Sequence, residues 1–344
     1  MIALAALGAT VSASPLAAAL LLIVVVAFAW NLGAHYTGAV MGMPVAAGAI
    51  AEWPALLVIG ALTIVGATFA SGRVETTVGR DIISDHAVRI PDAIVIVLAA
   101  GLFTLLYNYW RIPTSTIQIL VFCVVGVGLA GAIPIHWATI AALAVVWVCA
   151  PVIAFALGYL FTRLLDLVIP PGTLPAPRGE RAATRTRAAL RWAPRLLVAV
   201  GAGASFTLGA NDVANATGAL ILAHQFSLEV AGLIGGVAMA VGALTWGRGI
   251  LRRVAFDVVA MDLSMASAAQ GVQALVVLVA ATQGLFTSMN QALIGAMAGA
   301  GLARGRETVK RAQLLGILRG WAIGPLSGFA LGFALEWLAR LLVR

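Results

Sequence analysis

Residues 205–218 read SFTLGANDVANATG, and Asp212 is the only charged side chain among them. Asn211 and Asn215 are four residues apart, which places both amides on one face of a helix. A carboxylate and two amides in an apolar segment predict either a binding site inside a membrane or a hydrogen-bond cluster that packs helices. We favour the binding site, because an ionisable group is costly to place in lipid.

The composition of the whole chain supports a membrane setting. Of its 344 residues, 62% are hydrophobic and 10% are charged, and the mean hydropathy is +1.04. In soluble globular proteins about a quarter of all residues are charged, so this composition excludes a chain of two or three soluble domains. The net charge is +8. The sequence contains no recognisable DNA- or RNA-binding motif, and an excess of Arg is typical of the cytoplasmic loops of membrane proteins.

Long apolar stretches recur along the chain. A membrane span needs about 20 mostly apolar residues, and runs of this length without alternation favour helices. We therefore expect an all-α polytopic membrane protein with about 10–12 transmembrane helices. The candidate stretches are 15–34, 54–71, 91–109, 113–132, 136–162, 195–223, 228–246, 265–283, 287–303 and 313–343.

A segment rich in Pro and Arg divides the chain. Residues 166–194 hold clustered prolines followed by a run of Arg, a composition typical of a linker. The positive charge predicts that this linker is cytoplasmic. We therefore expect a first membrane repeat at 1–165, the basic linker at 166–194 and a second membrane repeat at 195–344.

The two membrane units carry the same landmarks in the same order, 173 to 176 residues apart. These are Asn31–Ala34 with Thr207–Ala210, Pro113–Gln118 with Phe286–Gln291, and Trp147–Pro151 with Trp321–Pro325. The loop at 302–311 is rich in Arg, whereas its counterpart at 128–137 has no Lys or Arg. Equivalent loops that differ in this way are expected on opposite sides of the membrane. The pattern predicts inverted-topology repeats with discontinuous helices at the midplane, where Gly209 and Gly218 weaken the helix around Asp212.

The second landmark supplies hydroxyl and amide donors at the start of two predicted helices. The donors are Ser115, Thr116 and Gln118 in the first copy and Ser288, Asn290 and Gln291 in the second. Such donors at a helix N-terminus suit an oxyanion, although Ser and Thr also cap helices for structural reasons. Because the motif occurs in both repeats, we favour substrate binding.

Several other residues fit structural roles. Arg111 follows aromatic residues and fits an interfacial anchor, although it is also placed to draw an anion inward. The acidic residues at 75–92 and Asp262 fit solvated loops. Cys123 and Cys149 lie in apolar runs without the spacing of a metal site or a disulfide framework, so we expect them to pack in the bundle.

The four histidines show no metal-ligand spacing, and we expect no metal and no cofactor. They are His35, His86, His136 and His224. An intramembrane enzyme would need a base paired with a nucleophile, or a metal cluster. The cluster around Asp212 contains no such pair, so we do not expect an enzyme.

The segment at 209–216, GANDVANA, resembles the signature of the inorganic phosphate transporter (PiT) family, which carries it once in each of two inverted repeats. The segments 113–118 and 286–291 are similar to the family's Pro-x-Ser-Thr-Thr-His motif. The resemblance spans both halves of the chain. It implies secondary active uptake of an inorganic oxyanion, coupled to Na+ or H+.

The resemblance also implies roles for individual residues. Asn211 and Asn215 would bind the substrate together with the donors of the two Ser motifs. Asp212 and Asn31 would serve in cation coupling. Because the repeats are inverted, we expect alternating access by rocking of one repeat against the other.

The first repeat departs from the family signature. His35 and Tyr36 stand where the signature has Asn and Asp, and Gln118 and Gln291 replace the His of the Ser motif. Loss of one of two carboxylates should weaken a sodium site built from both, and it removes negative charge from a site that faces an anion. The first-repeat pattern looks more like the sulfate permease branch, and sulfate stays a dianion at neutral pH whereas phosphate exchanges a proton.

These observations favour a cation-coupled sulfate symporter slightly over a phosphate symporter of the same family, and a passive anion channel is a further alternative. The expected partners are the oxyanion and the lipid bilayer of the plasma membrane, without nucleic acid. A homodimer is left open by the sequence.

Overall fold

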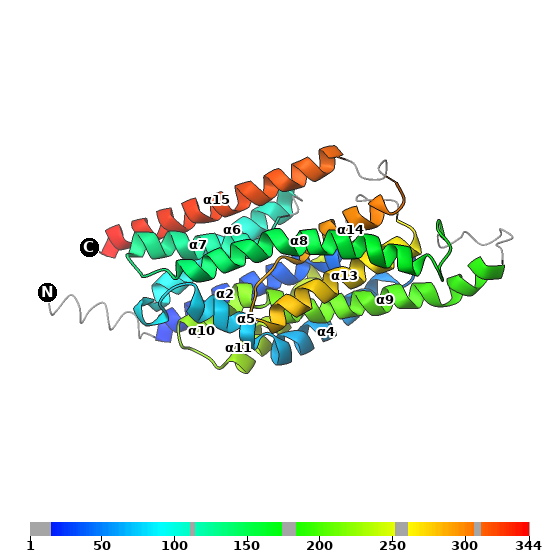
Figure 1. Cartoon of the computed structure of the whole chain (residues 1–344). Helices are drawn as coiled ribbons and strands as arrows, with labels where there is room; N and C mark the ends of the chain where they lie inside the picture. Colours follow the sequence, from blue (N-terminus) through cyan, green and yellow to red (C-terminus); the bar gives the residue numbers. More distant parts are fainter. Residues whose placement is uncertain (1–14, 111–113, 174–183, 252–260, 306–310, 344) are drawn as a thin grey trace.

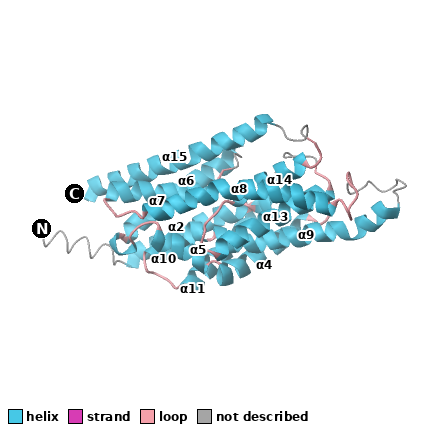
Figure 2. Ribbon diagram, in the orientation of Figure 1, coloured by secondary structure: helices cyan, strands magenta, loops and turns pink. Residues whose placement is uncertain are grey.

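The structure, a computed structural model, describes residues 15–110, 114–173, 184–251, 261–305 and 311–343, and helices dominate it throughout (Figure 2). In chain order the helices are α2 (Pro15–His35), α3 (Thr37–Ala46), α4 (Glu52–Ala70), α5 (Gly72–Thr76), the π-helical turn η1 (Thr77–Asp81), the 3-10 turn η2 (Asp85–Ala87), α6 (Ile90–Trp110), α7 (Thr116–Gly131), α8 (Trp137–Leu165), α9 (Thr184–Asp212), α10 (Ala214–Leu222), α11 (Leu228–Thr245), α13 (Leu263–Thr282), α14 (Met289–Leu302) and α15 (Arg311–Val343). The predicted all-α fold is confirmed.

Eight helical segments among the described residues are long and apolar enough to cross a membrane. Each of the ten stretches predicted from the sequence forms a helix, but α7 and α14 have only 16 and 14 residues. At 1.5 Å per residue they are about 24 and 21 Å long, whereas the hydrocarbon core is about 30 Å thick. The residues that precede them, Ser115 and Ser288, are buried, so the two short helices begin inside the bundle.

The outer surface of the bundle is apolar, as lipid requires. On α8, for example, Val145, Val148 and Val152 are exposed, whereas Leu143 and Trp147 are buried. Side chains three or four residues apart share one face of a helix. One face of α8 therefore packs in the protein, and the other carries large apolar side chains that water would not favour.

The order of elements in the first half recurs in the second, with the direction reversed. Each half has an interrupted helix (α2–α3, α9–α10), two spans (α4 and α6, α11 and α13), a short helix (α7, α14) and a long helix with an internal proline (α8, α15). In Figure 1, α2 and α8 run from left to right, whereas α9 and α15 run from right to left. This arrangement is the inverted repeat that the loop charges predicted.

The two halves interlock rather than lie side by side. Each short helix packs along the long helix of the other half: α7 on α15, and α14 on α8. The helices α4 and α9 also pack closely across the halves. An added Cβ would lie 2.0 Å from the Phe206 carbonyl oxygen at Gly66, and 2.1 Å from the Thr63 carbonyl oxygen at Gly209. Gly209 therefore serves close packing here.

Basic residues gather at one end of the bundle. Arg163 is in the last turn of α8 and Arg191 is near the start of α9. Both of these helix ends lie at the right-hand end in Figure 1. In the sequence, the segments 174–183, 252–260 and 306–310 contain further Lys and Arg. The helix α9 begins at Thr184, so the last third of the predicted linker is helical.

An ion-pair cluster ties the two halves together at this Arg-rich end. Arg304 binds Asp166 at 2.5 Å and Asp262 at 2.8 Å, and it donates to Ser264. Burial opposes ionisation of Asp262, but hydrogen bonds from the Met265 and Gly172 N–H groups and from Arg304 hold its pKa below the ordinary value. Asp262 is buried, so its assignment to a solvated loop was wrong.

A matching cluster occurs at the other end. Asp92, in the first turn of α6, is buried and pairs with Arg89 at 2.9 Å and with Arg340 of α15 at 3.6 Å. Arg340 also binds Glu336 of its own helix at 2.5 Å. A charge this buried needs such partners, so the solvated loop predicted at 75–92 does not include Asp92.

The close packing of α4 on α9 leads to a prediction about stability. Gly66→Ala should lower the stability of the purified protein by about 1–3 kcal/mol, the usual cost of overpacking, because its methyl group would meet the α9 backbone. Gly60→Ala on the same helix is the control, since its added Cβ would lie 3.4 Å from the Ala240 Cβ, an ordinary contact. Thermal unfolding in detergent measures both, and equal melting temperatures would contradict the packing account.

Candidate functional site

Two short helices begin at the centre of the bundle with the same cap. Ser115 precedes α7 and Ser288 precedes α14, both in extended backbone. The Ser115 Oγ accepts from the Gln118 N–H and the Ser288 Oγ from the Gln291 N–H, each at 3.4 Å. Both serines are thus helix caps. The first turn of a helix also carries N–H groups that no carbonyl of the same helix can accept.

The starts of α7 and α14 lie against each other. The Asn290 side chain donates to the Thr114 carbonyl oxygen at 2.9 Å. The Gln291 side chain donates to the Gln118 Oε1 at 3.1 Å. The sequence-predicted donors Ser115, Gln118, Ser288, Asn290 and Gln291 are therefore brought together, and all are buried. Two positive helix ends meet at one point inside an apolar bundle.

The Asp212 motif joins this point from the second interrupted helix. The Asn211 amide donates to the Asp212 Oδ2 at 3.0 Å and to the Thr287 carbonyl oxygen at 2.7 Å, and the Thr287 N–H donates back to the Asn211 Oδ1 at 3.4 Å. The Asn215 amide donates to the Asp212 carbonyl oxygen at 3.0 Å and to the Thr116 Oγ1 at 3.4 Å. The motif thus contacts the start of both short helices.

The interruptions in the long helices are small. One residue, Tyr36, separates α2 from α3, and Val213 separates α9 from α10. Both of these residues make backbone hydrogen bonds: the Tyr36 N–H donates to the Leu32 carbonyl at 3.2 Å, and the Val213 carbonyl accepts from the Thr217 N–H at 3.1 Å. The sequence predicted a wider unwound segment between Gly209 and Gly218. Gly218 instead packs on Val78, since an added Cβ would lie 2.3 Å from that side chain.

Four buried oxygens in this region have no hydrogen-bond partner within the described part of the chain. They are Asp212 Oδ1, Asn215 Oδ1, Thr287 Oγ1 and Gln291 Oε1. Buried polar atoms are normally bonded, and an unpaired one calls for an explanation such as an ion. Carboxylate, amide and hydroxyl oxygens are the donor set of a hard cation.

The first repeat contributes a histidine and a tyrosine in place of the acidic motif. The Tyr36 hydroxyl is 2.7 Å from the Thr116 Oγ1. The His35 ring bonds Asn108 of α6 through Nδ1, and its Nε2 lies 3.4 Å from the Asn290 side-chain nitrogen. Because the Asn290 nitrogen can only donate, His35 accepts at Nε2, which corresponds to a neutral ring. The sequence counterparts His35 and Asn211 thus both meet the start of α14, His35 from the first half and Asn211 from the second.

Asn31 lies in the network of His35, one turn earlier on α2. Its Oδ1 accepts from Asn108 at 2.7 Å and its Nδ2 donates to the Gly101 carbonyl at 3.4 Å. These contacts attach Asn31 to α6, and its role in cation coupling stays a prediction. Arg111 lies outside the described residues.

Sequence reasoning missed the polar residues of α13. The Gln270 side chain donates to the Ala39 carbonyl at 3.0 Å and also to Gln273, which donates to the Met289 carbonyl at 3.3 Å. These glutamines connect the start of α3 to the start of α14. Their burial in a predicted span was the available signal, because amides in lipid need partners.

The extended stretch before α14 is held from both sides. The Trp147 indole of α8 donates to the Phe286 carbonyl at 3.0 Å, next to the Thr287 backbone that Asn211 binds. On the Arg-poor end an open cavity of about 320 Å³ is lined by Leu285, Asp81 and His136, among others. The cavity therefore adjoins the residue that leads into this stretch.

A second buried carboxylate lies beside α10. Glu75 is fully buried, its Oε1 accepts from the Thr217 hydroxyl at 2.5 Å, and its Oε2 has no partner in the described ranges. Burial raises the pKa of Glu75 to about 7, while the hydrogen bond from Thr217 acts in the opposite direction. The prediction of a solvated loop at 75–92 is wrong for this residue as well.

Residues 32–332 match the sequence profile of the phosphate transporter family. The sulfate permease CysP of Bacillus subtilis is 26% identical over 310 residues, which cover 90% of this chain and 84% of the relative. The inorganic phosphate transporter 2-1, chloroplastic, of Arabidopsis thaliana is 22% identical over an alignment of 410 positions that covers 90% of this chain and 70% of the relative.

A solved structure titled the sodium-dependent phosphate transporter superposes with a TM-score of 0.85 at 22% identity. The superposition covers 94% of this chain and 98% of that chain. This likeness establishes the fold of a membrane transporter.

The raised pKa of Glu75 predicts that the stability of the folded protein depends on pH. The pKa of this carboxyl is about 7 in the folded protein and 4.5 in the unfolded chain. The folded protein therefore keeps its full stability below pH 4.5, where the group is protonated in both states, and loses stability as the pH rises through 7. Glu75→Gln should remove a pH-dependent loss on the order of 3 kcal/mol. Asp81→Asn, at an exposed carboxyl, should leave that loss in place.

Thermal unfolding in detergent at several pH values between 5 and 8 measures this difference. If the wild-type protein and Glu75→Gln lose stability in parallel over this range, the burial of Glu75 has no effect on its ionisation.

Proposed function

We propose that this chain, which belongs to the phosphate transporter family, is a cation-coupled symporter that imports an inorganic oxyanion, with sulfate favoured over phosphate. The observation that carries the proposal is the meeting of the α7 and α14 N-termini, bonded through Asn290 to Thr114 and through Gln291 to Gln118. Two like helix dipoles that point to one place repel each other, and an anion between them relieves the repulsion.

The oxyanion would be bound by neutral donors. Ser115, Thr116 and Ser288 offer hydroxyls, and the first turns of the two short helices offer N–H groups. Asn211 and Asn215 bring amides from the interrupted helix, and they already bond the Thr287 backbone and Thr116. Donors of this kind bind a dianion without a fixed opposite charge, so release on the other side of the membrane stays feasible.

Asp212 would bind the coupling cation. Its free Oδ1, with the unpaired oxygens of Asn215, Thr287 and Gln291, supplies ligands that suit Na+. Because Asn211 and Asn215 contact both Asp212 and the short helices, the cation and the oxyanion would share neighbours. Each would reduce the electrostatic cost of binding the other. Na+ and H+ both fit a lone buried carboxylate.

Sulfate is favoured because the first repeat lacks the second carboxylate. Protonated phosphate presents an O–H that needs an acceptor, whereas sulfate only accepts hydrogen bonds at neutral pH. In this chain Tyr36 stands at the position of the missing Asp, and its hydroxyl is engaged with Thr116. The unpaired oxygens around Asp212 would be occupied by the cation. A site that leaves a substrate O–H unpaired discriminates against it.

The membrane orientation follows from charge. We infer that the Arg-rich end, with the linker at 166–194, faces the cytoplasm of a cell whose plasma membrane holds the protein. The open cavity beside Leu285, Asp81 and His136 would then face outward. Import would proceed by rocking of the interlocked halves about the point where the two Ser motifs and the two interrupted helices meet.

Substrate choice can be measured with purified protein in liposomes. Labelled sulfate should accumulate severalfold faster than labelled phosphate when a Na+ or pH gradient is imposed, because the first repeat has no second carboxylate to accept the phosphate proton once the cation occupies the oxygens around Asp212. Dissipating both gradients should abolish accumulation. Faster phosphate uptake would instead identify a phosphate symporter, and flux that persists without either cation gradient would identify an anion channel.

Asp212 can be tested by charge removal. Asp212→Asn keeps the size of the side chain and should reduce gradient-driven uptake at least about tenfold, which corresponds to a loss of about 1.4 kcal/mol. Glu229→Gln, at an exposed position, should transport normally. Uptake by Asp212→Asn at the wild-type rate and with the wild-type cation dependence would refute its role in coupling, even if the transport proposal held.

A further inference from the structure

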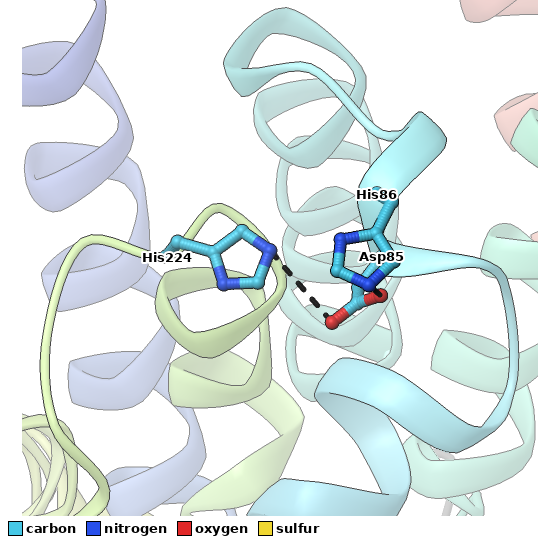
Figure 3. Close-up of side chains that lie close together, drawn as sticks. All are labelled: Asp85, His86 and His224. Atoms are coloured by element: carbon cyan, nitrogen blue, oxygen red, sulfur yellow. Dashed lines mark ion pairs between the residues drawn. The ribbon is translucent and has the colours of Figure 1, made fainter.

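Two loops that are far apart in the sequence meet at the Arg-poor end of the bundle. The first contains η2, with Asp85 and His86, and the second is the turn after α10, with His224. In Figure 3 the two imidazole rings come from opposite sides, and dashed lines join the Asp85 carboxylate to both. The expectation that the histidines are too scattered to bind a metal therefore does not hold for this pair.

The ligand atoms of this cluster are slightly farther apart than those of an occupied metal site. His86 Nε2 is 3.6 Å from Asp85 Oδ1, and His224 Nε2 is 3.7 Å from Asp85 Oδ2. One ligand atom from each residue lies within 4.8 Å of the others. In a tetrahedral zinc site with bonds of about 2.1 Å, neighbouring ligand atoms are about 3.4 Å apart. Small side-chain rotations would bring all three atoms to one ion.

The backbone of His224 provides a second, independent observation. His224 has a φ of +52°, and its N–H bonds the Ile221 carbonyl while the Gln225 N–H bonds the Leu220 carbonyl. This is the left-handed residue that ends many helices, a position that favours glycine. A histidine at this position lacks the conformational freedom of glycine, and its imidazole lies toward Asp85.

The rings themselves are arranged in parallel. The centroids of His86 and His224 are 6.1 Å apart at an interplanar angle of 17°. The His86 side chain is 89% exposed and the Asp85 side chain 16%, so an ion from solvent can reach the cluster. An exposed ion pair alone contributes little to stability, and it does not account for a histidine at the left-handed position.

We propose that Asp85, His86 and His224 form a binding site for a divalent transition metal of the zinc class. Two imidazoles and one carboxylate select such an ion over Mg²⁺ or Ca²⁺, which take oxygen ligands. Three protein ligands leave a fourth position for water. Since η2 belongs to the first half and the α10 turn to the second, the bound ion joins the halves at the end opposite the Arg304 cluster. The site does not depend on the transported substrate.

The test is titration calorimetry with tag-free protein in detergent after treatment with a chelator, using ZnCl2 and MgCl2. The wild-type protein should bind one Zn²⁺ at this site and no Mg²⁺, and Zn²⁺ should raise its melting temperature. His86→Ala should weaken Zn²⁺ binding at least about tenfold. His136→Ala is the matched control, an exposed histidine at the same end of the bundle, and it should bind like the wild type.

His224→Gly separates ligand loss from misfolding. Glycine suits the left-handed position, so this variant should melt at or above the wild-type temperature without metal, yet lose the rise caused by Zn²⁺. If His86→Ala and His224→Gly bind Zn²⁺ as the wild type does, or if the wild type binds none, the proposal is overturned. An equal response to MgCl2 and ZnCl2 would also overturn it.

Discussion

Two helix N-termini that face one point inside an apolar bundle impose the main electrostatic constraint on this structure. The starts of α7 and α14 carry the same partial positive charge, and they are joined by the bonds from Asn290 to Thr114 and from Gln291 to Gln118. In lipid no water is present to screen their repulsion. The surrounding amides and hydroxyls, and the single carboxylate of Asp212, are the groups that balance it.

The interlocked architecture follows from the same constraint. A helix that begins in the middle of the bundle needs a long neighbour along its whole length, and each short helix finds that neighbour in the opposite half. Its start also needs support, which Asn211 gives to the Thr287 backbone and Trp147 to the Phe286 carbonyl. The site therefore belongs to neither half alone, and a relative motion of the halves would alter it directly.

The halves are alike in backbone but different in charge. Asn211 and Asp212 of the second half correspond to His35 and Tyr36 of the first. His35 contacts α14 through Asn290, and Asn211 contacts the residue that leads into α14, Thr287. The second interrupted helix therefore brings a carboxylate to this point, and the first brings a histidine and a tyrosine. This asymmetry is what separates the substrate preference proposed here from that of a site with two carboxylates.

Much of this arrangement could be predicted from the sequence, because lipid allows few solutions. The apolar stretches, the inverted halves and the two Ser motifs follow from span length, loop charge and repetition. The burial of Glu75, Asp92 and Asp262 could not be predicted. A sequence does not show the partner on a distant helix, and without that partner a carboxylate near a loop is predicted to face solvent. The cluster of Asp85, His86 and His224 could not be predicted either, because it is formed by two loops from different halves.

The central claim is that an oxyanion binds where α7 and α14 begin. Selenate has the shape and charge of sulfate, and its selenium scatters anomalously, so crystals grown with selenate locate it directly. The account predicts an anomalous peak within hydrogen-bond distance of the Ser115 and Ser288 helix starts. A peak confined to the Arg-rich end, with none between the two short helices at saturating selenate, would contradict it.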